Sequence, residues 1–328
     1  MLPSLQSGTI LRNRYRLTNI VGQGGMGSVY RAEDLRLPGR LCAIKEIQAD
    51  PEASDELRSQ LQTQFLQEAS ILAQLDHPNL PKVSDYFADG EREYLVMDYV
   101  PGKDLKQILD ESRADGRFLD EKLILTWAEQ IMDALDYLHR QDPPVLHRDV
   151  KPANIKLTPD QRIKLVDFGL VKIMAADDNR TITVVQGRGT AQYTPLEQYG
   201  GDEGHTDVRT DIYALGATFY HLFAGTPPPD AKSRFLNPAR LRPLPQIRTI
   251  SQTVADAIAW AMEMHPDERP SSVAAFRQVL HGHALRPGKT AVANPTPSLW
   301  QALAKHRTVA FITLLMLVFA LLITLFFS

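Results

Sequence analysis

Residues 147–154 of this chain read His147-Arg148-Asp149-Val150-Lys151-Pro152-Ala153-Asn154. The string places a carboxylate, Asp149, two residues before a lysine and five residues before an amide. A carboxylate in such a place can accept or orient the proton of a substrate hydroxyl, and the amide oxygen of Asn154 suits a magnesium ion. The string therefore predicts a loop that carries proton transfer beside a metal ion.

A second carboxylate follows in Asp167-Phe168-Gly169, thirteen residues beyond Asn154. The residues 162–166 before it read as a strand. We expect Asp167 to bind the magnesium ion that bridges the β and γ phosphates of ATP.

A glycine-rich run, Gly22-Gln23-Gly24-Gly25-Met26-Gly27-Ser28-Val29, lies near the N-terminus. Glycines let a backbone approach phosphate groups closely, because no Cβ intervenes. A dinucleotide site uses a similar run, but there the loop opens a helix. Here residues 28–31 favour a strand, so the run is predicted to cap a hairpin.

A lysine follows at the end of the strand predicted for 41–47, in Ala43-Ile44-Lys45. Such a lysine can contact the α and β phosphates of ATP when a carboxylate holds it, and Glu68 in the helix predicted for 55–75 is the candidate. A lone lysine or glutamate is most often a solvated surface charge. The order of the other motifs argues against that interpretation here.

Taken together and in this order, the motifs resemble the bacterial Hanks-type, eukaryotic-like serine/threonine protein kinases of the PknB type, over about residues 12–282. The resemblance implies an α+β fold with two lobes and an ATP–magnesium cleft between them. It places a small lobe at 15–97 and a larger helical lobe at 98–282. Residues 1–14 are then an N-terminal extension.

The resemblance also implies which residues bind nucleotide. Met97 corresponds to the gatekeeper, Asp98 and Val100 to the adenine hinge, and Asp104 to the acidic contact with ribose or substrate. The full predicted set is Val21, Gly22, Gln23, Gly24, Gly25, Met26, Gly27, Ser28, Val29, Ala43, Lys45, Met97, Asp98, Val100 and Asp104.

Further roles follow from the same resemblance. Lys151 matches the lysine of kinases that act on serine or threonine, and Thr190 would line the pocket for the substrate residue. Asp211 should brace the catalytic loop, and Glu197 should pair with Arg269. With Lys45 and Glu68, Asp149 and Lys151 complete the predicted catalytic set.

Three features depart from the family pattern. Pro195-Leu196-Glu197 stands in place of Ala-Pro-Glu, which keeps the glutamate but changes the turn. Lys156 takes the place of an apolar residue under the adenine, which predicts a cost in ATP affinity unless its methylenes cover the ring. The segment between Lys45 and Glu68 is longer than usual.

Arg148 beside Asp149 suggests activation by phosphorylation, because a phosphate can order a loop by pairing with arginine. Thr181 and Thr183 lie between Asp167 and Thr190 and are the candidates. They can equally be ordinary loop residues. Autophosphorylation would bring two copies of this chain together, so a dimer is among the expected partners.

The segment 308–327 contains twenty residues without a charge. As a helix it would be about 30 Å long, the thickness of a bilayer's hydrocarbon core. Lys305, His306 and Arg307 precede it, which places the kinase domain in the cytoplasm of a single-pass membrane protein. The alternative is a buried core helix. Residues 283–307 would be a juxtamembrane linker.

Composition limits the remaining options. The chain has 328 residues, of which 44% are hydrophobic and 23% charged, as in a folded protein. A net charge of −3 does not favour nucleic acid, so the expected partners are protein substrates and the membrane. The rival functions are a pseudokinase scaffold and a membrane-tethered adaptor that binds partners through the proline-rich residues 227–245, which we expect to form loops.

Overall fold

In the computed structural model, the residues described are 3–24, 27–48, 54–90, 92–167, 191–199 and 206–286. Every element below lies within the compact unit 1–284. No helix in the described part of the chain has the length and apolar character needed to cross a membrane. The membrane helix predicted at 308–327 lies outside the described residues.

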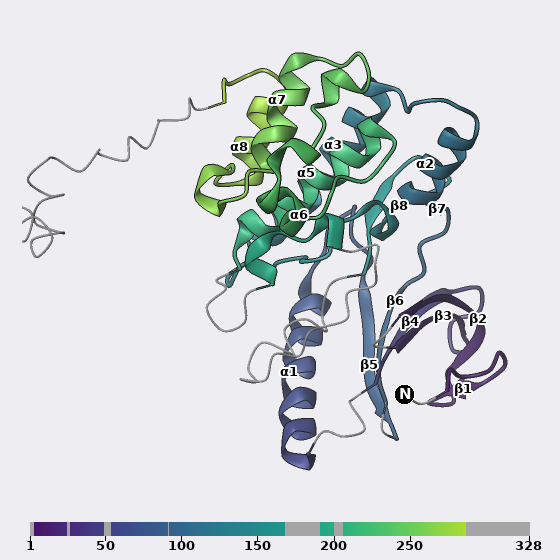
Figure 1. The fold of residues 1–328 in the computed structure, drawn as a ribbon. Coiled ribbons are helices and arrows are strands. Elements are labelled where there is room, and N and C mark those ends of the chain that lie inside the picture. Colours follow the sequence, from purple (N-terminus) through teal and green to yellow (C-terminus); the bar gives the residue numbers. More distant parts are fainter. Residues whose placement is uncertain are drawn as a thin grey trace, which may run out of the picture. The chain divides into compact units, whose positions relative to one another are not determined.

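The N-terminal part is a six-stranded antiparallel sheet in the order β1-β2-β3-β4-β6-β5 (Figure 1). Its strands are β1 (Ile10–Leu11), β2 (Tyr15–Gly24), β3 (Gly27–Asp34), β4 (Leu41–Gln48), β5 (Val83–Asp89) and β6 (Arg92–Asp98). The glycine-rich run joins β2 to β3, with Gly24 opposite Gly27. The predicted hairpin is therefore confirmed.

Side chains of the central strands alternate between two faces, as the pleat requires. One face forms a closed apolar cluster made of Leu11, Tyr15, Leu17, Tyr30, Ala32, Cys42, Ile44, Phe87, Tyr94 and Val96. The other face carries Val29, Ala43 and Lys45, which are half-buried. The residues predicted to meet the nucleotide thus share the face that is not filled by the sheet's own core.

One helix, α1 (Asp55–Gln74), interrupts the sheet between β4 and β5 and runs beside β5 (Figure 1). Ala69, Leu72 and Leu75 are buried at intervals of three residues and join a second, larger hydrophobic cluster. That cluster continues into the helical part of the chain, so α1 contacts both parts.

The C-terminal part is mainly helical. It contains α2 (Leu105–Ala114), α3 (Glu121–His139), α5 (Val208–Ala224), α6 (Ala231–Leu236), α7 (Gln252–Ala261) and α8 (Val273–Leu280). A small antiparallel sheet of β7 (Lys103–Asp104), β8 (Ile155–Leu157) and β9 (Ile163–Leu165) accompanies these helices. Short 3-10 turns lie at Pro152–Asn154, Ala191–Tyr193, Leu196–Gln198, Pro238–Arg240, Leu244–Gln246 and Pro266–Glu268.

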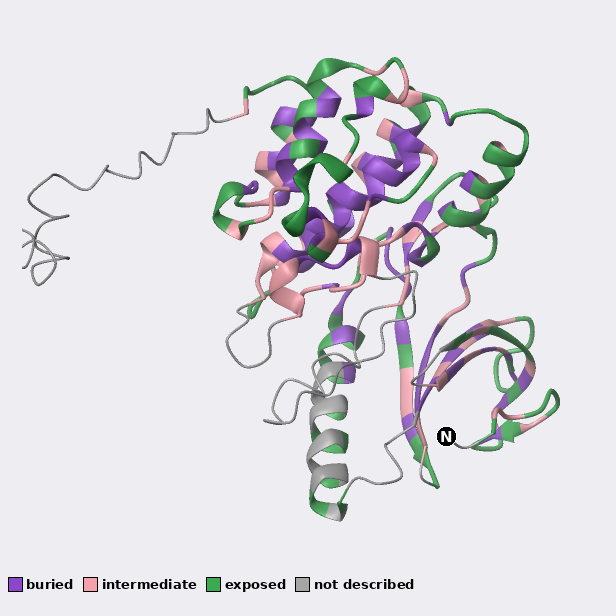
Figure 2. Cartoon of the chain, viewed as in Figure 1, coloured by how far each residue is buried: buried purple, intermediate pink, exposed green. Residues whose placement is uncertain are grey.

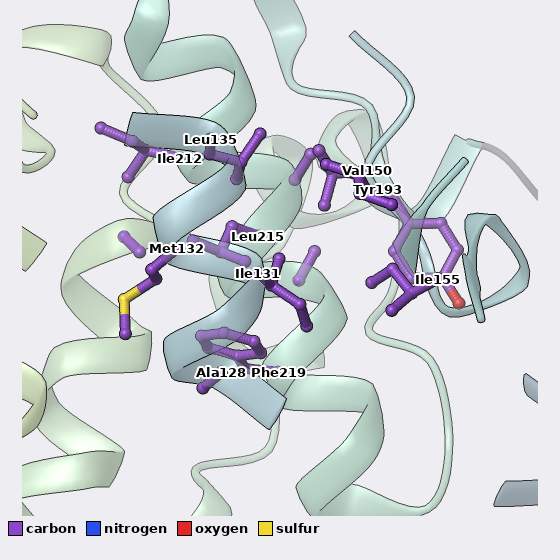
Figure 3. Packing of buried hydrophobic residues seen from close by; sticks show 14 of the residues in the cluster. Ala128, Ile131, Met132, Leu135, Val150, Ile155, Tyr193, Ile212, Leu215 and Phe219 are labelled. Atoms are coloured by element: carbon purple, nitrogen blue, oxygen red, sulfur yellow. The ribbon is translucent and has the colours of Figure 1, made fainter. Parts of the chain in front are cut away.

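Helix α5 is the centre of this part, because fifteen of its seventeen residues are buried (Figure 2). Ile212, Leu215 and Phe219 of α5 pack near Ile131 and Leu135 of α3 (Figure 3). At Gly216 a Cβ would lie 2.8 Å from Cβ of Ala261, so the close contact between α5 and α7 requires glycine.

The prediction that residues 227–245 form only loops was wrong. Helix α6 forms within them because the Asp230 carboxylate accepts a hydrogen bond of 2.8 Å from the backbone N–H of Ser233. Such an N-cap stabilises the first turn of a helix. The prolines remain outside α6: three precede it, at 227–229, and three follow it in the turns at 238–246.

Candidate active site

Asp149 is held by two neighbours in its own loop. The ammonium of Lys151 lies 2.8 Å from Oδ2 of Asp149. The Asn154 amide donates hydrogen bonds of 2.9 Å to the same carboxylate oxygen and to the Asp149 carbonyl. Pro152 begins the 3-10 turn that carries Asn154 back toward Asp149. The loop sequence alone thus brings a carboxylate, an ammonium and an amide together.

Asp211 of α5 braces this loop from beneath. Its buried carboxylate accepts hydrogen bonds from the backbone N–H groups of His147 at 2.8 Å and Arg148 at 2.7 Å. Arg148 has φ of 62°, a left-handed conformation that costs a residue with a side chain about 1 kcal/mol or more. The two hydrogen bonds hold that conformation in place. The brace expected of Asp211 is confirmed.

Two buried groups here have shifted ionisation. Burial alone would raise the pKa of Asp211, but hydrogen bonding and charge from His139 and the His147 N–H outweigh it, so its pKa lies below the ordinary value. Burial lowers the pKa of His147. A neutral His147 can donate from Nε2 to the Val166 carbonyl, 3.2 Å away. Asp211 is therefore the charged group that supports the backbone of this loop, beside a neutral His147.

The same contacts fix the residue before Asp167. The backbone N–H of Val166 donates to the Asn154 carbonyl at 2.8 Å, and the Val166 carbonyl faces His147. Asp167 then turns out of β9 with φ of 63°. The end of β9 and the loop that carries Asp149 are thus bonded to each other.

Lys45 of β4 forms an ion pair with Asp167. Burial would raise the pKa of Asp167, but the charge and hydrogen bond of Lys45 prevail, so the pKa lies below its usual value. The structure describes the backbone of α1 at Glu68 but not its side chain. The predicted pair of Lys45 and Glu68 therefore remains a prediction.

The nucleotide-binding residues of the sheet follow its register. Val29 pairs with Lys45, and Ala43 pairs with Met97 in β6. Gly27 lies against β4, since a Cβ at Gly27 would lie 2.1 Å from the Glu46 carbonyl oxygen. Gly25 and Met26 fall outside the described residues. The remaining loop positions, Val21, Gly22, Gln23, Gly24 and Ser28, are in β2 and β3.

The predicted hinge joins β6 to the helical part. Met97 and Val100 are buried, while Asp98 is half-exposed, and its backbone N–H donates to the Lys82 carbonyl at 3.0 Å. Asp104 caps α2, because its carboxylate accepts from the Gln107 N–H at 2.8 Å. The contacts of the hinge and of Asp104 with nucleotide stay predictions.

Lys156 lies half-buried in β8, opposite Asp104 of β7 and Lys164 of β9. The Lys164 ammonium donates to the Leu80 carbonyl at 3.0 Å. For Lys156, the described part of the chain offers no hydrogen-bond or ion-pair partner. This unusual lysine thus stands at the position expected beneath the adenine, with no counter-group among the residues that the structure describes.

Glu197 and Arg269 form the predicted ion pair. The guanidinium nitrogens of Arg269 lie 2.6 and 3.1 Å from the two carboxylate oxygens of Glu197. Arg269 also donates to the carbonyls of Glu263 and Met264. The altered turn at Pro195 therefore leaves this anchor intact.

The donor groups fit a magnesium ion. Asp167 offers carboxylate oxygens and Asn154 an amide oxygen, and hard cations prefer such ligands. No group of three or more histidine, cysteine, aspartate or glutamate side chains suited to a metal occurs within the described ranges. A magnesium ion that also binds substrate phosphates needs only one or two carboxylates from the protein.

The sequence reasoning missed two supporting residues. His139 Nε2 lies 2.9 Å from Oδ2 of Asp211, and the Thr218 hydroxyl donates to the Val150 carbonyl at 3.2 Å. Thr218 stands seven residues after Asp211, which puts both on one face of a helix, so spacing would have found it. Thr181, Thr183 and Thr190 lie outside the described residues.

Comparison with known proteins identifies this arrangement. The model of the protein kinase domain family matches residues 15–282. The chain belongs to the protein kinase family. This kinase is 38% identical over 223 residues to "Probable serine/threonine-protein kinase" of Streptomyces coelicolor, an alignment that covers 66% of this chain and 31% of the relative.

Two further comparisons agree. The kinase is 36% identical to serine/threonine-protein kinase PknB of Mycolicibacterium smegmatis, over 66% of this chain and 33% of the relative. It superposes on the crystal structure of the PknI kinase domain of Mycobacterium tuberculosis with a TM-score of 0.64 and 29% identity, over 86% of this chain and 100% of that one. The chain spans about a third of the length of these curated relatives.

The predicted family, a bacterial serine/threonine kinase of the PknB type, is therefore confirmed. So is the two-lobed protein kinase fold. The family in general uses ATP and magnesium, which agrees with the oxygen donors described above.

Proposed function

We propose that this chain is an ATP- and magnesium-dependent protein kinase that phosphorylates serine or threonine residues of proteins. One observation carries the proposal: the Asp149 carboxylate is bound by both Lys151 and Asn154. Through Asn154 and Val166 the same loop is bonded to the strand that ends at Asp167. Base, ammonium and magnesium ligand thus belong to one hydrogen-bonded unit.

In the proposed reaction the substrate hydroxyl oxygen attacks the γ-phosphorus of ATP, and the bond from that phosphorus to the bridging oxygen of ADP breaks. Asp149 orients the hydroxyl and receives its proton. Lys151 faces the phosphoryl group as it moves, and Lys45 binds the α and β phosphates. Asp167 and Asn154 would hold a magnesium ion, which would supply positive charge against the phosphates. Positioning and charge supply most of the catalysis in such transfers.

The test is transfer of radiolabel from ATP to a general protein acceptor by the full chain, beside an Asp149→Asn variant. The proposal requires label with the wild type and a loss of at least about 100-fold in the variant. Equal signals would favour a pseudokinase scaffold. Partner binding that survives Lys45→Ala and Asp167→Asn together would favour the adaptor.

We further propose that the kinase is anchored in the cell membrane by residues 308–327, with its catalytic domain in the cytoplasm. The uncharged twenty-residue segment and the preceding cluster of Lys305, His306 and Arg307 support this. Membrane fractions from cells should retain the full chain after alkaline carbonate extraction. Recovery of the full chain in the carbonate supernatant would contradict the anchor.

Regulation by autophosphorylation is the last part of the proposal. Thr181 or Thr183 would receive phosphate from a second copy of the chain, and Arg148 would help to order the phosphorylated segment. Mass spectrometry of the purified kinase, with and without ATP, should locate the phosphate. A Thr181→Ala/Thr183→Ala variant that keeps full activity would contradict this regulation.

A further inference from the structure

The N-terminal residues 3–7 lie against the sheet rather than apart from it. The backbone N–H of Leu5 donates a hydrogen bond of 2.9 Å to the Tyr30 hydroxyl. The Ser7 hydroxyl donates to the Thr18 carbonyl at 2.6 Å. The Leu5 side chain packs against the apolar cluster of the sheet. Main chain and side chains both attach this segment, which we call the N-terminal strap.

A closed ring of polar contacts fastens the strap to β3, β4 and β6. The Tyr30 hydroxyl donates to Oε2 of Glu46 at 2.8 Å, and Oε1 of Glu46 pairs with Arg92. Arg92 in turn donates to the Pro3 carbonyl at 2.8 Å. The Glu46 side chain is fully buried and that of Arg92 is 12% exposed. A buried charge pair is costly to break, so Glu46 and Arg92 are held in place, and with them the groups that bind the strap.

Ser4, the strap residue between Pro3 and Leu5, contacts the glycine-rich hairpin. Its hydroxyl oxygen lies 3.2 Å from that of Ser28 and accepts a hydrogen bond of 3.1 Å from the Gln23 side chain. Gln23 and Ser28 face each other across the hairpin, one pair before Gly24 and Gly27. One hydroxyl therefore contacts both strands at the base of the glycine turn.

The strap and two of the nucleotide-binding residues, Val29 and Lys45, lie on opposite faces of the same strands. Ser28, Tyr30 and Glu46 point into the covered face, while Val29 and Lys45 alternate with them on the other. Gly27 rests directly on the Glu46 carbonyl. If the strap moved, the positions of the glycine turn and of β4, the strand that carries Lys45, would therefore change as well.

We infer that the N-terminal strap holds the glycine-rich hairpin in the shape that receives ATP, with Ser4 and Tyr30 as positioning residues. The inference rests on the proposed function. A hairpin that is already ordered loses less conformational freedom when nucleotide binds. Loss of one such hydrogen bond is expected to raise the KM for ATP about fivefold while kcat stays within about twofold.

The experiment uses the full chain with the variants Ser4→Ala, Tyr30→Phe and Ser4→Thr. Ser7→Ala is the matched control, because the Ser7 hydroxyl is in the same strap but donates to the Thr18 carbonyl, outside the ring and away from Gln23 and Ser28. KM for ATP and kcat are measured with a general protein acceptor. Ser4→Ala and Tyr30→Phe should raise the KM, Ser4→Thr should restore it, and Ser7→Ala should leave it unchanged. An unchanged KM in the first two variants overturns the inference, as does an equal rise in Ser7→Ala.

Hydrogen exchange provides a readout that does not depend on phosphoryl transfer. Backbone amides of 22–29 should exchange about fivefold faster in Ser4→Ala and Tyr30→Phe than in the wild type and in Ser7→Ala. If the wild type transfers no phosphate, the proposed function fails. The hydrogen-exchange rates still test whether the strap orders the hairpin. Equal exchange in all four proteins overturns the strap whether or not the kinase is active.

Discussion

Arg269 donates two hydrogen bonds, of 2.6 and 3.1 Å, to the carboxylate of Glu197, and the Arg269 side chain is completely buried. The pair joins the turn Leu196–Gln198 to the end of the turn Pro266–Glu268, and the centre of the Tyr213 ring lies 4.9 Å from the Arg269 guanidinium carbon. Removing one partner would leave the other charge buried without its counter-charge. That cost is large even where the intact pair contributes little net stability.

We therefore predict that Arg269→Met destabilises the folded kinase by about 3–5 kcal/mol. Urea unfolding followed by circular dichroism at neutral pH measures the change. The matched control is Lys106→Met, which removes the exposed pair with Asp110 and should cost less than about 1 kcal/mol. A loss below about 1 kcal/mol for Arg269→Met would show that the pair is not a structural anchor.

A second prediction concerns the ion pair of Lys45 and Asp167. Lys45→Met and Asp167→Asn should each lower phosphoryl transfer by at least about 100-fold, because each removes a charge that faces the phosphates or the magnesium ion. The assay is radiolabel transfer at saturating ATP. Lys82→Met is the control, since the Lys82–Asp76 pair is exposed at the surface. Activity within tenfold of wild type in either site variant would refute the assigned roles.

The third prediction concerns Lys156. Placing an ammonium beneath the adenine costs solvation free energy, and the described residues supply no partner to offset it. Lys156→Met keeps a long apolar stem without the charge, so it should lower the KM for ATP about threefold to tenfold. Values of kcat should stay within about twofold, because Lys156 lies outside the set that contacts the γ-phosphoryl. A raised KM would mean that the ammonium itself helps to bind nucleotide.

The sequence predicted the parts of the site whose chemistry repeats at fixed spacing. Asp149, Lys151 and Asn154 lie in one loop, so their contacts follow from local geometry. The hairpin also followed from its glycines and from the strand pattern beside them. Glu197 and Arg269 could be paired only through the family resemblance, because seventy-two residues separate them.

The N-terminal strap could not be predicted in this way. Pro3 and Ser4 have no spacing that signals a contact, and Glu46 next to Lys45 reads as an ordinary surface charge. The burial of Glu46 depends on Tyr30 and Arg92, which come from two other strands. Helix α6 was missed for a different reason: the prolines around it obscured the N-cap at Asp230. Contacts between distant segments need the fold itself.

His221 illustrates the same point and leads to the last prediction. It lies buried in α5, and its Nδ1 is 2.6 Å from the hydroxyl of Tyr193. Burial lowers the pKa of His221 to about 4; the charge of Asp110 opposes this shift, and the cations Lys106 and Arg113 of α2 add to it. The neutral ring accepts a hydrogen bond from Tyr193, which holds the turn after Thr190 against α5.

Because the pKa of His221 is lower in the folded state than its ordinary value of about 6.5, the unfolded chain binds a proton first as the pH falls. This contribution to stability is therefore complete above about pH 6.5 and declines toward pH 4. Between pH 7 and pH 5 the wild type should lose about 2 kcal/mol through His221. The free energy of unfolding in urea is measured at both pH values. His221→Gln should lack this pH-dependent loss, and the exposed control His265→Gln should show it as the wild type does. Equal losses in all three proteins would mean that His221 does not titrate as proposed.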